Sequence, residues 1–86
     1  MPKNVTFEML VLTLERCGVN VEIRDLADDD VNIKSGLCEI GGRRTLIVDE
    51  RLGENGRVAA AMEALRSQNL DGIFVPPAVR ELLNDE

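Results

Sequence analysis

The chain has 86 residues, of which 44% are hydrophobic and 30% charged, enough for a single domain over residues 1–86 with one modest core. Sixteen acidic and ten basic residues give a net charge of -6, which disfavours binding to the phosphates of nucleic acids. No apolar run approaches membrane-spanning length, and no secretory signal is recognisable, so we expect a cytoplasmic protein without a membrane partner.

The first predicted element is a helix that either Asn4 or Thr6 can cap. Apolar residues recur in it at helical spacing, at Phe7, Leu10, Leu14 and Cys17. Gly18 then offers the left-handed conformation that commonly ends a helix. Because further apolar residues such as Leu12 lie outside this stripe, the helix should be contacted on two sides.

A strand should follow directly, since Val19, Val21 and Ile23 alternate with polar residues. This period-two pattern is typical of a strand with one buried face. Residues 24–35 are polar and acidic and predict a solvated loop at one end of the sheet.

The strongest local pattern is a hairpin whose two-residue turn, Gly41-Gly42, accommodates positive φ at both positions. The expected register pairs Leu37 with Leu46, Cys38 with Thr45, Glu39 with Arg44, and Ile40 with Arg43. One face of the ribbon then carries Cys38, Ile40 and Ile47, and the other carries Leu37, Leu46 and Val48. Both faces are therefore partly apolar, and both require cover.

Residues 54–68 predict a second helix, because four alanines favour it and apolar residues repeat on one side, at Val58, Met62 and Leu65. Gly53 and Gly56 weaken its first turn, so its start should lie between residues 54 and 57. Residues 73–75 are predicted as a short strand or extended segment, and Pro77 can open a terminal helix over residues 78–83.

These elements predict an α+β fold in the order α-β-β-β-α-β-α, with a small mixed or antiparallel sheet packed on helices. The order of strand, glycine hairpin, strand ending in Leu-Ile-Val-Asp-Glu-Arg-Leu and alanine-rich helix resembles the core of the ImmA/IrrE-like zinc metallopeptidases, over roughly residues 35 to 70. The same order is also a common arrangement in unrelated α+β domains. The resemblance implies a fold and no more.

The zinc motif of that family, HExxH, is missing from the matching stretch, residues 61–66. Glu63 falls where the glutamate would stand, but Met62 and Arg66 replace both zinc ligands. The chain contains no histidine at all, so Ser35 and Ser67 also lack the base of a hydrolase triad. We therefore expect no enzyme, no cofactor and no zinc.

The acidic segment carries a partial calcium-loop pattern. Asp28, Asp30 and Asn32 stand at alternate positions with Glu39 at the twelfth, but Ile33 occupies the sixth position, where the turn requires glycine. The densest basic cluster comprises Arg43, Arg44, Arg51 and Arg57. A small-ligand or metal-ion binding domain that uses the acidic loop or the arginine cluster is therefore the alternative hypothesis.

Cys17 and Cys38 form no CxxC pair and have apolar neighbours, so we interpret both as small buried hydrophobic residues. The C-terminal run, residues 73–83, is unusually apolar for the end of so small a domain. Together with the hairpin it supplies more apolar surface than one small core hides, which predicts a homodimer or a complex with another protein. The predicted interface consists of Leu37, Leu46, Val48, Phe74, Val79, Leu82 and Leu83.

Overall fold

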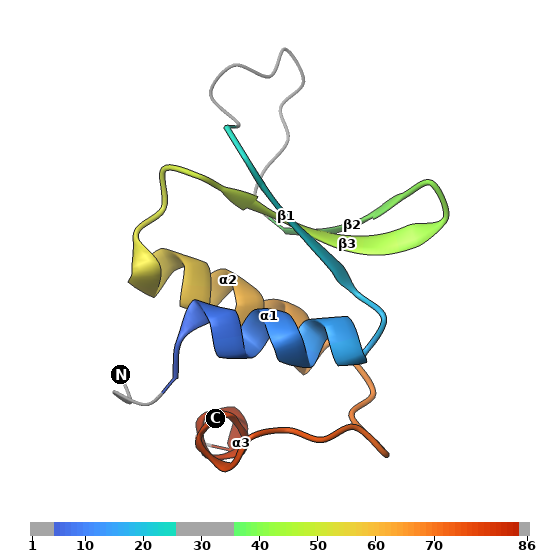
Figure 1. The fold of residues 1–86 in the computed structure, drawn as a ribbon, viewed down its shortest axis with the longest axis vertical. Coiled ribbons are helices and arrows are strands. Elements are labelled where there is room, and N and C mark those ends of the chain that lie inside the picture. The colour runs from blue at the N-terminus through green and yellow to red at the C-terminus, as the bar shows by residue number, and fades with distance from the viewer. Residues whose placement is uncertain (1–4, 26–35, 85–86) are drawn as a thin grey trace.

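The structure, a computed structural model, describes residues 5–25 and 36–84. Within them the chain forms α1 (Phe7–Arg16), β1 (Asn20–Arg24), β2 (Gly36–Ile40), β3 (Arg43–Asp49), α2 (Glu54–Arg66) and α3 (Pro77–Asn84). Figure 1 shows how these elements are arranged. The α+β class and the order of these six elements are as the sequence predicted.

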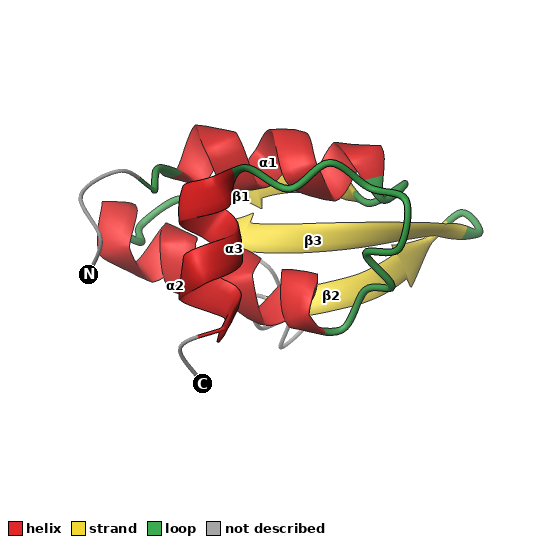
Figure 2. Cartoon of the chain, turned by 90° about the horizontal axis from the view of Figure 1, so that it is seen from below, coloured by secondary structure: helices red, strands yellow, loops and turns green. Residues whose placement is uncertain are grey.

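The elements lie in three layers. The sheet is the first layer, α1 and α2 lie side by side in the second, and α3 crosses beneath them in the third (Figures 1 and 2). Helix α1 runs along the β1 side of the sheet and α2 along the β2 side (Figure 2). The described helices therefore all lie on the same side of the sheet, and α1 and α2 are the two that cover it.

The sheet is mixed, with the strand order β1-β3-β2 in the described chain. Strand β1 pairs with β3 in parallel, and β2 pairs with β3 antiparallel. The predicted hairpin register is confirmed at all four pairs, and the turn glycines have φ values of 59° and 79°. Strand β3 is thus central, while β1 and β2 are the two edges.

Local signals account for the position of α1. Of the two candidate caps, Thr6 is the N-cap: its hydroxyl oxygen accepts a hydrogen bond from the Met9 N–H at 3.3 Å. Gly18 has the positive φ of 83° that ends the helix. Glu54, in the first turn of α2, accepts the Phe7 N–H at 2.9 Å. This bond joins the N-termini of the two helices of the middle layer.

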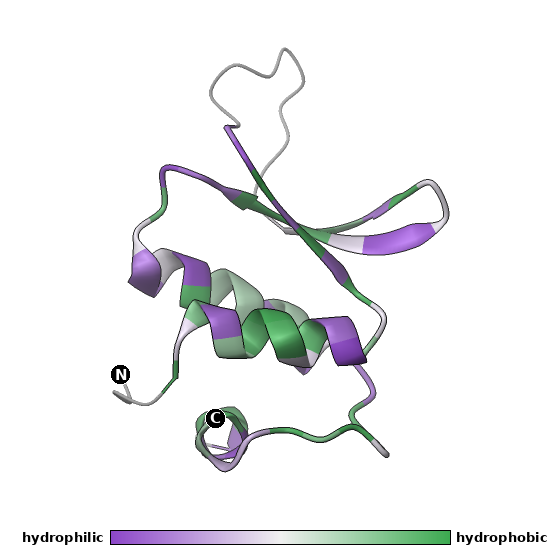
Figure 3. Cartoon of the chain, in the orientation of Figure 1, coloured by the Kyte–Doolittle hydropathy of each residue, from purple (hydrophilic) through white to green (hydrophobic). Residues whose placement is uncertain are grey.

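The core fills the space between the layers. Leu10 and Leu14 of α1 are completely buried. They belong to a cluster that also includes Leu46, Val48, Val58, Met62, Leu65, Val75 and Val79. In Figure 3 the middle of α1 has hydrophobic colour, whereas the start of β3 beside the turn is hydrophilic.

Residues 73–75 form no strand but the extended segment that was the other expected outcome. The segment passes over α1, where the Phe74 ring lies 5.4 Å from the Arg16 guanidinium carbon (Figure 2). No sheet edge is available there, because β1 and β2 lie beyond the helices. Val75 is buried against the core instead.

Among the described residues, no helix is long and apolar enough to cross a membrane.

Candidate functional site

Three of the seven residues predicted at an interface belong to the chain's own core. Leu46, Val48 and Val79 are at most 1% exposed. The first two lie on the central strand and face the helices, and Val79 packs from α3 against the same cluster. These three residues therefore have no free surface to offer a partner, which corrects that part of the predicted interface.

The other four residues reach the surface to different extents. Leu82 and Leu83 are half-buried on α3. Phe74 is 63% exposed and Leu37 is 38% exposed, but they lie on different layers of the fold. The structure thus does not assemble the predicted interface residues into one patch. Of the four that reach the surface, Leu37 is the one that lies on the sheet.

Strand β2 pairs only with β3 among the described strands, and it carries exposed apolar side chains. Leu37 points to the helix side and Ile40, 39% exposed, to the other side. In a two-residue hairpin the residues that flank the turn form a hydrogen-bonded pair, and such pairs alternate along the ladder. The backbone N–H and C=O groups of Leu37 and Glu39 therefore point away from β3, toward the open edge.

The opposite edge of the sheet is more polar. On β1 the Glu22 carboxylate pairs with the Arg24 guanidinium at 2.7 Å and also accepts from the Asn20 amide. Charged side chains of this kind protect edge strands from pairing with another chain. Strand β2 carries only Glu39 as a charged residue, so it is the edge better suited to strand addition.

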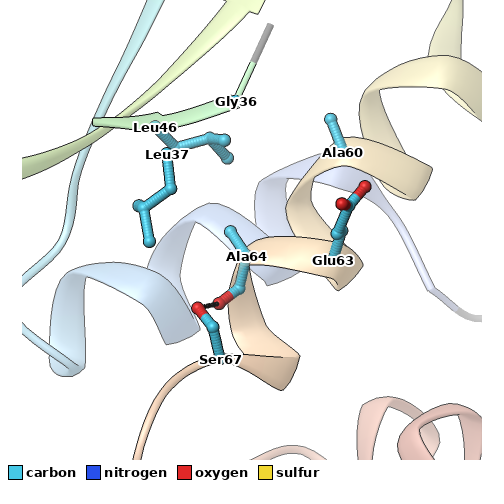
Figure 4. A pocket seen from close by; sticks show the side chains of 7 residues that line it. All are labelled: Gly36, Leu37, Leu46, Ala60, Glu63, Ala64 and Ser67. Carbon is cyan, nitrogen blue, oxygen red and sulfur yellow. Dashed lines mark hydrogen bonds between the residues drawn. The ribbon is translucent and has the colours of Figure 1, made fainter.

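A pocket of about 380 Å³ lies beneath β2, between the sheet and α2 (Figure 4). Leu37 and Leu46 reach toward it from the sheet, and Ala60 and Ala64 face it from the helix. Its remaining lining residues are Gly36, Glu63 and Ser67. Because α2 presents small side chains here, the helix leaves apolar space under the open edge.

The polar groups of the pocket have little catalytic capacity. The Ser67 hydroxyl donates to the Ala64 carbonyl at 2.7 Å, so its proton is already engaged (Figure 4). Glu63 rises from α2 beside Ala60 and is exposed. At the hairpin end of the pocket, the Arg44 guanidinium donates to the Gln68 side-chain carbonyl. The pocket lining therefore offers one carboxylate, and Arg44 lies outside it.

The two ligand-binding alternatives have different outcomes. Asp28, Asp30 and Asn32, which carry the calcium-loop spacing, lie outside the described residues. The arginine cluster is divided, because Arg51 pairs with Asp49 at 2.8 Å at the end of β3 while Arg44 lies near its start. In the described part of the chain, no three side chains are placed to hold a metal ion.

The residues that match the metallopeptidase helix are also separated by the structure. Met62 is buried in the core, Glu63 lines the pocket, and Arg66 is exposed. A side chain at position 62 therefore points away from the carboxylate at position 63. The arrangement fits an amphipathic helix, with Glu63 on its outer side.

The two cysteines differ in exposure. Cys17 is half-buried, but Cys38 is exposed, so the prediction that both are buried is wrong for Cys38. The reason is that Cys38 lies on an edge strand and points away from the helices. On the same face, Thr45 and Ile47 of the central strand are buried, at 2% exposure, whereas Cys38 at the edge is not.

We expect Cys38 to react with iodoacetamide roughly tenfold faster than Cys17 in dilute native protein. Burial raises the pKa of the Cys17 thiol above its ordinary value, and the nearby Arg44 charge only partly offsets this. Less of the reactive thiolate is therefore present at Cys17 at any pH near neutrality. Peptide mass spectrometry over a time course measures both rates. Equal rates in the native protein, as expected after unfolding in urea, would contradict the structure.

The pocket was not predicted from the sequence. Its helix side shows a spacing of i, i+3, i+4 and i+7, at Ala60, Glu63, Ala64 and Ser67, but in the sequence the alanines by themselves indicate only a helix. No protein family, curated protein or solved structure matches the chain. The geometry of β2 and α2 is therefore the main indication of function.

Proposed function

We propose that this protein is a non-enzymatic interaction module that binds a second copy of itself through the β2 edge and the adjoining pocket. The observation that carries the proposal is the edge strand, which has outward-facing backbone groups and exposed apolar side chains on both faces. An edge of this kind is a template for addition of another strand. We place this association in the cytoplasm, where Cys38 stays a free thiol.

The pocket also favours an interface at the β2 edge. Backbone pairing along a short edge buries little area, whereas specific interfaces bury about 800 Å² per partner. The apolar walls of the pocket, formed by Leu37, Ala60 and Ala64, add surface next to the edge. The alternative of a ligand site at the arginine cluster has less support, because Arg44 and Arg51 lie at opposite ends of β3.

Light scattering tests the proposal. Over about 10 to 500 µM protein, a range suited to a small interface, the mass should rise from the 9.5 kDa of one chain toward twice that value. Concentration must be followed by refractive index, because the chain has no Trp or Tyr. A mass that stays at 9.5 kDa over the whole range would sink the proposal.

A matched pair of variants locates the surface. Leu37→Glu places a charge on the β2 edge and should keep the protein monomeric over the same range. Leu12→Glu places the same charge on α1, where Leu12 is 54% exposed, and should associate like the parent. Far-UV circular dichroism checks that both variants are folded. If Leu12→Glu alone prevents association, the interface lies on α1.

A further inference from the structure

We infer that the pocket beneath β2 is a binding site for a small organic ammonium compound with an apolar body, whose charged nitrogen meets the Glu63 carboxylate. This site goes beyond the proposed self-association, because the lining residues of a single copy form it. The size of the pocket, its walls and its charged side chain each restrict the ligand.

The pocket has the size and the walls of a small-molecule site. Its volume of about 380 Å³ falls within the range of about 300–1,000 Å³ that such sites have. Leu37 and Leu46 form the sheet side, and Ala60 and Ala64 form part of the helix side (Figure 4). Walls of this kind favour the apolar body of a ligand, since apolar surface that leaves water contributes to binding.

The inner wall of the pocket belongs to the core of the protein. Leu46 is 1% exposed and Ala64 is 5% exposed, and both are members of the core cluster. Leu37, at 38% exposure, lies nearer the surface. Because these buried walls are already in place, a ligand does not have to reorganise the core in order to bind.

Glu63 favours a positively charged ligand. Among the described lining residues it alone is charged, and its carboxylate makes no ion pair or hydrogen bond with any described residue. Arg44, on the neighbouring strand β3, donates to Gln68 instead. An ammonium group is a donor without acceptors, so it can satisfy this carboxylate, whereas an anionic ligand would be repelled by it.

Ser67 has little capacity to hold a neutral polar ligand. Its hydroxyl donates to the Ala64 carbonyl at 2.7 Å and accepts from the Gln68 side-chain amide at 3.0 Å. The charge of Glu63 is therefore the polar feature of the lining that distinguishes one ligand from another. A neutral molecule of the same shape should bind more weakly than the ammonium compound.

Titration with cyclohexylmethylamine, compared with the neutral cyclohexylmethanol, tests the site. Amide NMR signals from both walls, at Leu37, Ala60 and Ala64, should shift with the amine and saturate with a Kd of about 1 mM. The alcohol should bind about three- to fivefold more weakly, because an exposed ion pair contributes modestly. Equal binding of amine and alcohol, or shifts confined to other elements, would overturn the inference.

Glu63→Gln isolates the charge, because it nearly keeps the shape of the side chain. The Kd of the amine should rise about three- to fivefold, to that of the alcohol, while the alcohol binds as it does to the parent. The control is Glu15→Gln, which removes the same charge from an exposed position on α1 and should leave both Kd values unchanged. A rise of equal size in the two variants would show that net charge, and not Glu63, attracts the amine.

A second pair of variants tests the pocket itself. Ala60→Leu places a larger side chain in the pocket and should abolish binding of both compounds. Ala59→Leu, at an exposed position of the same helix outside the lining, should bind both like the parent. Far-UV circular dichroism checks that both variants are folded. Normal binding by Ala60→Leu would place the ligand elsewhere.

The titration uses dilute protein, in which a single copy leaves the pocket free, so its result is separate from that of light scattering. Binding of the amine by a protein whose mass stays at 9.5 kDa at every concentration supports the site, although the proposed self-association fails. A protein that associates at high concentration but binds neither compound when dilute overturns the site alone.

Discussion

Replacing Leu14 with alanine should lower the free energy of unfolding by about 2–5 kcal/mol. Leu14 is completely buried where α1 meets the other core elements, so the change removes apolar contacts and leaves a cavity. A domain of this size has a total stability of about 4–13 kcal/mol, and the loss is therefore a large share of it. Urea unfolding followed by far-UV circular dichroism measures the change, because the chain has no Trp for fluorescence.

The matched control is Leu12→Ala on the same helix. Leu12 is 54% exposed, so the same truncation should change the free energy of unfolding by less than about 0.5 kcal/mol. The comparison separates burial from helix propensity, which is the same for both substitutions. Equal losses at positions 12 and 14 would show that α1 does not pack as described.

Replacing Gly42 or Gly53 with serine should change the free energy of unfolding in opposite directions. Gly42→Ser should cost about 1–2 kcal/mol, because Gly42 has a φ of 79°, a left-handed conformation that side chains disfavour. Gly53→Ser should stabilise by about 0.5 kcal/mol, because Gly53 is the N-cap of α2 in an extended conformation and serine can cap the helix there. Apart from the adjacent residues, a Cβ at either position meets no atom within 4 Å, so packing does not decide the result.

Thermal and urea unfolding of the two serine variants measure this difference. Because the Gly41-Gly42 turn holds β2 in register on β3, Gly42→Ser should also weaken self-association, whereas Gly53→Ser should leave it unchanged. A stabilising effect of serine at position 42 would contradict the φ values of the turn. An effect of Gly53→Ser on the dimer alone would place the interface near the start of α2.

Local signals were sufficient for most of the secondary structure. The cap at Thr6, the stop at Gly18, the turn at Gly41-Gly42 and the proline at the start of α3 each act within a few residues. The hairpin register follows from the turn length alone, so all four pairs were predictable. The start of α2 at Glu54 lies within the predicted window of residues 54 to 57, because the glycines at positions 53 and 56 are also local signals.

The choice of edges and faces required the tertiary structure. Both faces of the hairpin are partly apolar, and its pattern is the same whether β2 or β3 lies at the edge. The parallel pairing of β1 with β3 makes β3 central, which buries Leu46 and Val48 and leaves Leu37 and Cys38 exposed. The pocket likewise depends on the position of α2 under β2. Contacts between segments distant in the chain decide these features, and no pattern within one segment encodes them.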